Sequence, residues 1–225
     1  MSRIIYSHTE SNNHTDWFLE GDGRIGTASD GALQLTTVDT GLEWPKTPPC
    51  CTLWLKKKLP NEYLIEYDFA LEKGAGASIA FIDAQGVKDA DIFSWSRSAG
   101  WEGYADLGLM RMYTMSFARI DSSGVNMRKL WAPKRGKEVD KEVGKETSPV
   151  ISANPVDPCT NYNNYYHHRI EKTGNHILMT VDGEVIHDYT DDGVYGPPLQ
   201  GGWFAVRNFR YVRTTRWKNM VVTAL

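Results

Sequence analysis

The sequence has little cysteine, and this scarcity excludes a protein held together by disulfides. Only 3 of the 225 residues are cysteines, at Cys50, Cys51 and Cys159. Two of them are adjacent, the count is odd and no C-x-x-C pair is present, so we expect neither a disulfide framework nor a zinc site. Unpaired cysteines of this kind are typical of a reducing compartment.

Long apolar runs and a large excess of charge are also missing. No apolar run approaches the roughly 20 residues that a helix needs to cross a bilayer. Residues 1–16 are polar and lack the apolar core of a secretion signal. The net charge is −3, which gives no overall electrostatic reason to bind nucleic acid or an anionic membrane. We therefore expect a cytoplasmic protein that binds neither, and any attraction for an acidic ligand must be local.

The composition is that of an ordinary soluble globular protein, with 41% hydrophobic and 24% charged residues. β sandwiches of this length commonly form one domain around one large core, so we expect residues 1–225 to form a single domain. The most hydrophilic part, residues 133–149, carries charges of both signs and is expected to be a solvated loop. A mobile lid is the alternative interpretation of that loop.

Short stretches in which apolar and polar side chains alternate predict β-strands along most of the chain. Between residues 62 and 71, Tyr63 and Ile65 share one face, whereas Glu66 and Asp68 share the other. Further strands are predicted at residues 31–37, 53–55, 77–82, 107–119, 126–131, 201–207 and 212–222, and three more between 166 and 186, separated by turns at 173–175 and 182–183. No convincing helix exceeds two turns, so the sequence predicts an all-β protein with two packed antiparallel sheets.

The order of these elements resembles the concanavalin A-like lectin/glucanase jelly rolls. In many of those proteins a strand ending in Val-Asp-Gly follows a Gly-Asn or similar turn, and a late Gly-x-hydrophobic-x-hydrophobic-Arg strand comes after it. A closer likeness is to a small group of bacterial proteins whose genes lie among those for breaking down pectin-type (rhamnogalacturonan) polysaccharides. The matching pieces are Asp16-Trp-x-x-Glu-Gly, Asp91-Ile-Phe93, Ser116-Phe-x-Arg119, Asn126-x-Arg-Lys129, Asp157-Pro158 and Asp191-Asp-Gly-x-Tyr-Gly-Pro197.

This resemblance covers the whole chain, and it implies an antiparallel jelly-roll β sandwich with a concave sheet that is used for a saccharide. One departure concerns the chemistry. Jelly-roll glucanases carry a strand-borne Glu-x-Asp-x-Glu or Glu-x-Asp-x-x-Glu, whose nucleophile and acid/base lie about 5–5.5 Å apart. Here Glu66 and Asp68 supply the first two carboxylates, but Ala70 and Leu71 stand where the last glutamate belongs. A retaining mechanism on this strand is therefore in doubt.

The stretch from Trp101 to Arg119 has the highest density of side chains suited to a sugar. Trp101 and Tyr104 could stack on sugar rings, and Asp106 could act as a catalytic carboxylate. Alternation along the following strand leaves two choices for the residues that face a groove. These are Arg111, Tyr113 and Arg119 for an anionic ligand, or Met110, Met112, Thr114 and Ser116.

The predicted site also includes four arginines and further aromatic side chains. Arg111, Arg119, Arg128 and Arg207 could each hold the carboxylate of an acidic sugar in a bidentate fork, or could pair across strands with Asp or Glu. Trp95, Tyr195 and Trp203 are further stacking candidates, whereas Trp17, Trp54 and Trp217 are assigned to the core.

Glu66 and Asp68 could share a groove and act in general acid/base catalysis, or could lie on a solvated sheet face. Alternatively, His168 as base and Tyr113 as acid could carry out a β-elimination, with an arginine neutralising the uronate. An ordinary hydrogen-bonded histidine is the other interpretation of His168.

We expect no cofactor, although Asp182-Gly183 and Asp191-Asp-Gly193 could hold a structural calcium ion. No run of alternating oxygen ligands is present, and tight turns explain both sequences. The sequence therefore predicts a carbohydrate-active protein that acts on an acidic plant or algal oligosaccharide or polysaccharide. Cleavage of a glycosidic bond by hydrolysis or β-elimination is the first interpretation, and a non-catalytic saccharide-binding module is the alternative.

Overall fold

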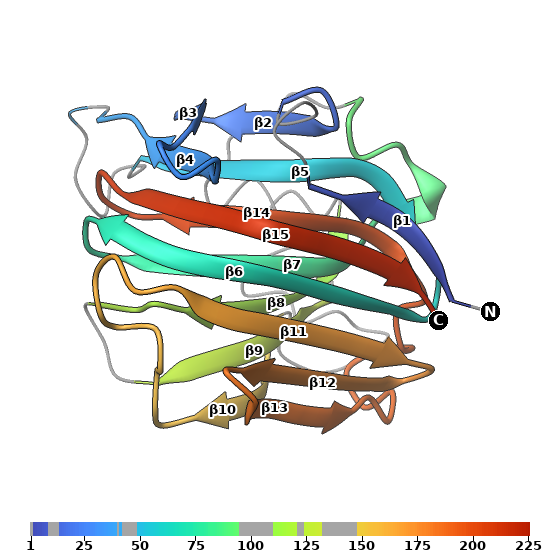
Figure 1. Ribbon diagram of the computed structural model, residues 1–225. Coiled ribbons are helices and arrows are strands. Elements are labelled where there is room, and N and C mark those ends of the chain that lie inside the picture. The colour runs from blue at the N-terminus through green and yellow to red at the C-terminus, as the bar shows by residue number, and fades with distance from the viewer. Residues whose placement is uncertain are drawn as a thin grey trace.

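In the computed structural model, the chain forms two antiparallel β-sheets that pack face to face (Figure 1). The structure describes residues 2–8, 14–39, 41, 49–94, 110–120, 124–131 and 148–225. Within these ranges the only helix is a 3-10 turn, Val87–Asp89, and no helix is long and apolar enough to cross a membrane. The predicted all-β sandwich with two antiparallel sheets is confirmed.

The first sheet, called the β6 sheet below, has eight strands in the order β13-β12-β11-β6-β15-β4-β3, with β1 paired to β15. Its strands are β1 (Arg3–Ser7), β3 (Gly23–Thr27), β4 (Leu33–Thr37), β6 (Tyr63–Lys73), β11 (Tyr166–Thr173), β12 (His176–Val181), β13 (Glu184–Thr190) and β15 (Thr214–Ala224).

The second sheet, called the β14 sheet, has seven strands in the order β10-β9-β8-β7-β14-β5-β2. Its strands are β2 (Trp17–Gly21), β5 (Cys50–Leu59), β7 (Ala77–Gly86), β8 (Met110–Phe117), β9 (Val125–Leu130), β10 (Val150–Asn154) and β14 (Gly202–Phe209). The runs β4 to β7 and β13 to β15 alternate between the two sheets, so their connections cross from one sheet to the other at the two ends of the sandwich.

The core between the sheets follows the alternation that the sequence predicts. On β6, Tyr63, Ile65, Tyr67 and Phe69 are fully buried, whereas Glu66 and Asp68 point outward and are only half-buried. The predicted core residues Trp17 and Trp217 are 3% and 1% exposed and pack in this core. Trp54, also predicted to be buried, is 0% exposed but belongs to a different apolar cluster.

That second cluster lies on the outer face of the β14 sheet, the face turned away from the β6 sheet. It contains buried residues from β5, β7, β8, β9 and β14, namely Trp54, Ile79, Phe81, Ala84, Met110, Met112, Leu130 and Ala205, together with Ile92. Strand β8 shows the division clearly, since Tyr113 and Phe117 pack between the sheets and Met110 and Met112 pack outside. The β14 sheet is therefore apolar on both faces.

Two sheet-crossing connections pack closely at one end of the sandwich, 74–76 between β6 and β7 and 210–213 between β14 and β15. Arg213 is fully buried there and donates hydrogen bonds to the carbonyls of Ala75 at 2.8 Å and Ala118 at 2.7 Å. Gly74 has a φ of +99°, and a Cβ at this position would lie 2.3 Å from the carbonyl oxygen of Val212. Only glycine fits where the two connections meet.

A pair of glycine variants tests this close approach. Gly183 also has a positive φ, +84°, but an added Cβ would meet nothing within 4 Å. We expect Gly183→Ala to lower the free energy of unfolding by about 1–2 kcal/mol, because only backbone strain is added. Gly74→Ala should lower it by roughly 1–3 kcal/mol more, because backbone atoms must also move. Urea denaturation of both variants measures the difference, and equal losses would show that the connections are not tightly packed at Gly74.

Candidate functional site

The outer face of the β14 sheet carries a group of aromatic rings that are not fully buried. Phe93 lies at its centre, with its ring centroid 4.8 Å from that of Trp203 and 5.5 Å from that of Phe18, both in edge-to-face geometry. Phe93 and Trp203 are half-buried and Phe18 is 39% exposed. Trp203 is on this face because alternate residues of β14 point outward, and Phe93 reaches it from the segment that follows β7.

The same face carries a buried arginine and one carboxylate. Arg207 is 0% exposed, and its Cζ lies 4.5 Å from the ring centroid of Phe209 and 5.8 Å from that of Phe81. Aromatic faces of this kind attract a guanidinium cation. Glu20 is 7% exposed and accepts a hydrogen bond of 2.6 Å from Nε1 of Trp54. Among the described strand residues of the β14 sheet, Glu20 is the only carboxylate on the outer face, because Asp83 points between the sheets.

Of the predicted arginines, the structure brings Arg128 and Arg207 to this face. Arg128 is paired in register with Thr114 of β8, and its Nη1 donates a hydrogen bond of 2.8 Å to the carbonyl of Ser148. Arg111 lies elsewhere, with its Cζ 4.0 Å from the ring centroid of Trp131. Arg119 follows the end of β8, where its backbone N–H donates to Asp157 at 2.6 Å and its side chain donates to the carbonyl of Gly124 at 3.4 Å.

Several predicted residues lie outside the described part of the chain. Trp101, Tyr104 and Asp106 are among them, as are Trp95 and most of the charged loop 133–149. The alternation along β8 nevertheless answers the question that the sequence left open. The outward residues of this strand are Met110, Met112, Thr114 and Ser116, and Tyr113 faces the core between the sheets.

Glu66 and Asp68 lie on the outer face of the β6 sheet, on the opposite side of the sandwich from Trp203 and Arg207. Nδ1 of His167 lies 2.8 Å from Oδ1 of Asp68, and Nε2 lies 3.8 Å from Oε1 of Glu66. Asn219 donates a second hydrogen bond to Asp68, at 2.7 Å. The His167 side chain is 50% exposed. These contacts are cross-strand polar pairs on a solvated face.

His168 lies in the core between the sheets and is 0% exposed. Its ring stacks on Tyr67 with a centroid distance of 4.9 Å, and its Nε2 lies 3.3 Å from Sγ of Cys159. Burial lowers the pKa of His168 to about 3 and raises the pKa of the Cys159 thiol, so both groups are neutral at pH 7. Tyr113 contacts other partners, and the structure does not bring it together with His168.

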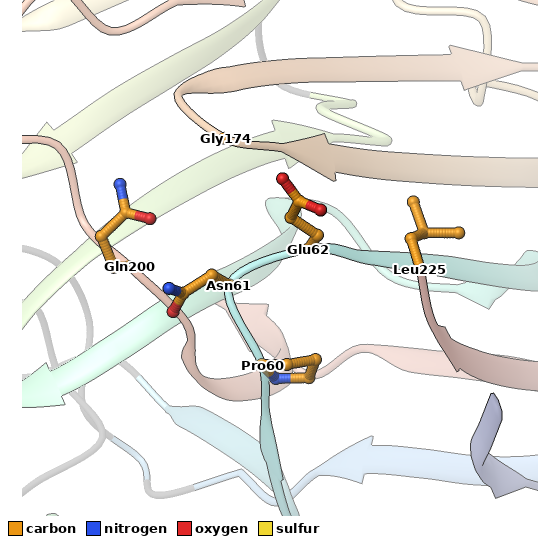
Figure 2. Close-up of a pocket in the computed structure, with 6 residues that line it drawn as sticks. All are labelled: Pro60, Asn61, Glu62, Gly174, Gln200 and Leu225. Atoms are coloured by element: carbon orange, nitrogen blue, oxygen red, sulfur yellow. The ribbon is translucent and has the colours of Figure 1, made fainter. Parts of the chain in front are cut away.

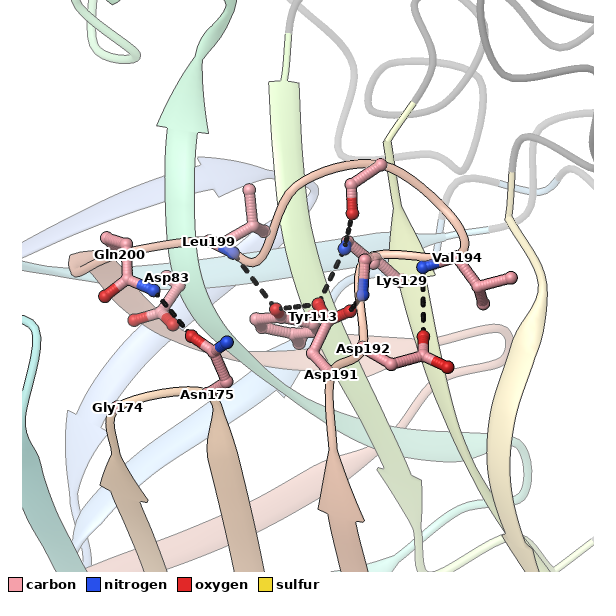
Figure 3. Close-up of polar contacts among 12 residues, drawn as sticks. Asp83, Tyr113, Lys129, Gly174, Asn175, Asp191, Asp192, Val194, Leu199 and Gln200 are labelled. Carbon is pink, nitrogen blue, oxygen red and sulfur yellow. Dashed lines mark hydrogen bonds and ion pairs between the residues drawn. The ribbon is translucent and has the colours of Figure 1, made fainter.

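A buried polar network that the sequence did not predict surrounds Asp191 (Figure 3). Asp191 and Lys129 form an ion pair of 2.6 Å with both side chains 0% exposed. The Tyr113 hydroxyl donates to Asp191 and accepts a hydrogen bond of 3.1 Å from the backbone N–H of Leu199. Lys129 also donates to the carbonyl of Gly196 at 2.6 Å. Burial raises the pKa of Tyr113 and lowers the pKa of Lys129, the latter against the opposing effect of Asp191.

A second buried pair lies at the same end of the sandwich. Nζ of Lys172 is 3.4 Å from Oδ2 of Asp83, both side chains are 0% exposed, and Tyr63 donates to Asp83 at 2.9 Å. Burial raises the pKa of Asp83 to about 6. A sequence signal for both pairs existed, because Lys129 and Lys172 share the inward faces of their strands with the apolar residues Met127 and Ile170. A lysine at such a position requires a buried partner.

An open polar cleft of about 580 Å³ lies at this end as well, lined by Pro60, Asn61, Glu62, Gly174, Gln200 and Leu225 (Figure 2). Gln200 donates to the side chain of Asn175 at 3.0 Å, and the carbonyl of Glu62 accepts from the backbone N–H of Leu225 at 3.2 Å. The lining offers amides and one carboxylate but no aromatic ring. It therefore lacks the stacking surface that the outer face of the β14 sheet provides.

The turns that could have held calcium use their carboxylates within the protein. Asp182 accepts a hydrogen bond of 2.7 Å from the backbone of His167, and Asp192 accepts one of 2.9 Å from the backbone of Val194. Asp191 is paired with Lys129. Among the residues that the structure describes, no group of three or more His, Cys, Asp or Glu side chains could hold a metal ion.

Known structures share this fold over nearly their whole length. A Bacillus subtilis protein described as a protein of unknown function with a galectin-like fold has a TM-score of 0.77 at 20% identity, covering 100% of this chain and 99% of that one. The carbohydrate-binding module CBM66 from Bacillus subtilis gives 0.57 at 14% identity, covering 91% and 93%. The alginate lyase vAL-1 from a Chlorella virus gives 0.60 at 11% identity, covering 99% and 100%. At these identities the likeness establishes a galectin-like jelly-roll fold.

At the level of sequence, the model of one family matches residues 3–222, and its description is "Domain of unknown function (DUF1961)". No curated protein matches the sequence.

Breaking the buried ion pair should cost far more stability than breaking an exposed one. Lys129→Met leaves the Asp191 carboxylate without its cation at a buried position, and we expect the free energy of unfolding to fall by about 3–5 kcal/mol. Lys57→Met breaks an ion pair with Asp16 whose side chains are 45% and 25% exposed, and should cost less than about 1 kcal/mol. Adding Asp191→Asn to Lys129→Met should recover part of the loss. If both single variants lost the same free energy of unfolding in urea denaturation, Lys129 and Asp191 would not form an ion pair that is buried from solvent.

His168 should make the protein sensitive to acid. Its pKa is about 3 in the folded protein, against an ordinary 6.5, so the unfolded chain binds the extra proton. The stability that this difference gives is present above pH 6.5 and is lost as the pH falls toward 3. We expect His168→Phe, measured by urea denaturation from pH 7.5 down to 4.5, to lose less stability on acidification than the unmodified protein.

The shifted pKa values of His187 and Asp83 also change how the free energy of unfolding depends on pH. His187, whose pKa burial lowers to about 4, adds to the same slope, so the variant should retain part of it. Asp83 acts in the opposite direction between about pH 4 and 6, because its pKa is raised. Parallel stability curves for the variant and the unmodified protein would contradict the role of His168.

Proposed function

The chain belongs to the family described as "Domain of unknown function (DUF1961)", and we propose that it binds a saccharide on the outer face of the β14 sheet. The observation that carries this proposal is the group of incompletely buried rings on that face, Phe18, Phe93 and Trp203, in the same sheet as Arg207. A sugar ring presents apolar C–H faces and polar hydroxyls. Aromatic planes with polar groups beside them suit both.

The charges on this face favour an acidic saccharide. Arg128 and Arg207 lie on the outward side of β9 and β14, whereas Glu20, the one outward carboxylate among the described strands of the β14 sheet, is bonded to Trp54. Arg128 is half-buried, and its guanidinium is of the kind that holds a carboxylate in a bidentate fork, as a uronic acid would require. Arg207 is 0% exposed and adds positive charge beneath the face. Pectic and algal oligosaccharides are therefore the first ligands to test.

Binding without cleavage is better supported than cleavage. Glycoside hydrolysis commonly requires two carboxylates flanking the scissile bond. The described strands place only Glu20 on the outer face of the β14 sheet, and Glu66 and Asp68 lie on the far side of the sandwich. The pair considered for β-elimination, His168 and Tyr113, points into the core. The similar folds of a carbohydrate-binding module and an alginate lyase support a saccharide ligand without deciding between these activities.

Calorimetric titration with pectic, ulvan-type and glucuronan oligosaccharides, alongside neutral glucan oligosaccharides, tests the proposal. We expect binding of at least one acidic oligosaccharide, and Trp203→Ala should weaken it by roughly 10-fold because a stacking ring is lost. Tyr165→Ala is the matched control. Tyr165 contacts Lys218 and Arg216 of β15 on the outer face of the β6 sheet, on the opposite side of the sandwich, so its loss should leave the affinity unchanged.

The same samples are followed for new reducing ends and for the absorbance of an unsaturated uronate. Binding without either product supports a binding module. New reducing ends without new absorbance would show that the protein is a hydrolase. New absorbance would show that it is a lyase. No binding to any of the oligosaccharides, or equal effects of Trp203→Ala and Tyr165→Ala, would refute the proposed site.

A further inference from the structure

The strand register fixes which side chains stand next to Trp203 on the outer face of the β14 sheet. Trp203 is paired directly with Lys58 of β5 on one side and with Ala84 of β7 on the other. Residues directly opposite each other in an antiparallel pair point to the same face. Leu59, the next residue along β5, packs in the core between the sheets, and neighbouring residues of a strand point to opposite faces. Both observations place Lys58 on the outer face, beside the half-buried Trp203.

The ammonium group of Lys58 is not used by the rest of the protein. Lys58 is exposed, and among the residues that the structure describes it has no hydrogen bond and no ion pair. The two preceding lysines differ in this respect. Nζ of Lys56 donates to the carbonyl of Thr15 at 3.0 Å, and Nζ of Lys57 lies 3.3 Å from Oδ1 of Asp16. Of the three lysines, Lys58 is the one that can bind a ligand without losing a contact to the described part of the protein.

Lys58 is also better placed than the two arginines of this face to reach a ligand on Trp203. Strands β7 and β8 separate β14 from β9, which carries Arg128, and neighbouring strands lie about 4.8 Å apart, so roughly 14 Å separates the two backbones. Directly opposite residues of an antiparallel pair, such as Lys58 and Trp203, have Cα atoms roughly 4.5–5.5 Å apart. Arg207 is 0% exposed. A cation that contacts the sugar stacked on Trp203 is therefore Lys58.

We propose that Lys58 binds the carboxylate of the sugar ring that packs on Trp203, so that the sugar at this position is itself a uronic acid. This inference rests on the proposed function and names the ligand unit that occupies one position of the same site. The carboxylate of a uronic acid projects from the edge of the sugar ring, whereas the C–H groups that pack on an aromatic plane lie on its face. An ammonium group beside the plane suits that edge, since its three N–H donors pair with a carboxylate.

The test compares the pectic, ulvan-type and glucuronan oligosaccharides with their methyl esters, which keep the sugar rings but lack the charge. We expect Lys58→Met to weaken binding of the acidic form about 5-fold, because one exposed charge pair is lost, and to leave the affinity for the ester unchanged. Lys58→Arg should retain most of the affinity for the acid, because the positive charge is kept. The difference between Lys58→Met and the unmodified protein should shrink as the salt concentration rises.

Lys57→Met is the matched control. It removes the same charge from the neighbouring position of β5, but this ammonium is already paired with Asp16, so the affinity for the acid should stay unchanged. Equal losses from the two lysine variants would show that only net charge matters. Equal losses for acid and ester would show that Lys58 has a structural role. Either result would overturn the inference and leave the proposed function standing, provided that binding still depends on Trp203. If the unmodified protein binds none of the oligosaccharides, the proposed function fails and the inference fails with it.

Discussion

The β14 sheet carries an apolar cluster on each of its two faces, and the arrangement of the sandwich depends on burying both clusters. Its inner face packs on the β6 sheet to form the core, as the buried residues Tyr113 and Phe117 show. Its outer face carries a second apolar cluster around Trp54 and Phe81. An antiparallel sheet in a sandwich commonly has one solvated face, and the β6 sheet follows that pattern with Glu66 and Asp68. The difference between the two sheets is the reason why we propose the outer face of the β14 sheet as the saccharide surface.

The sequence predicted the fold well wherever one face of a strand is polar. The alternation on β6 put Tyr63, Ile65 and Tyr67 on one face and Glu66 on the other, and the structure buries the first face. It could not choose the faces of β8, because Met112 and Tyr113 are both compatible with a core. Only the packing of β8 against the β6 sheet decides that Tyr113 is inside. The glycine-containing edge strand β3 was also missed, because it has little strand propensity of its own and is held by pairing with β4.

The contacts of the candidate site residues could be predicted less well than the fold, for a physical reason. The type of a residue indicates which interactions its side chain can make. The residue that it contacts, however, usually lies on another strand and is not known from the local sequence. Arg119 was assigned to ligand binding, yet it follows the end of β8 and bonds to the Gly124 carbonyl. Arg207 was predicted to bind a carboxylate or to pair across strands, but its contacts with Phe209 and Phe81 depend on how β7 and β14 pair. Lys129 was overlooked because its partner, Asp191, is 62 residues away in sequence.

The two buried ion pairs at the end of the sandwich also bear on how the strands align. A slip of β9 by two residues along β8 would keep every side chain on its own face, so apolar alternation alone cannot forbid it. That slip would move the ammonium group of Lys129 away from Asp191 and leave a charge in apolar surroundings. A slip of β11 along β6 would likewise move Lys172 away from its buried partner Asp83. The two lysines thus help to fix the strand register, because they disfavour shifted pairings that hydrophobic packing would otherwise tolerate.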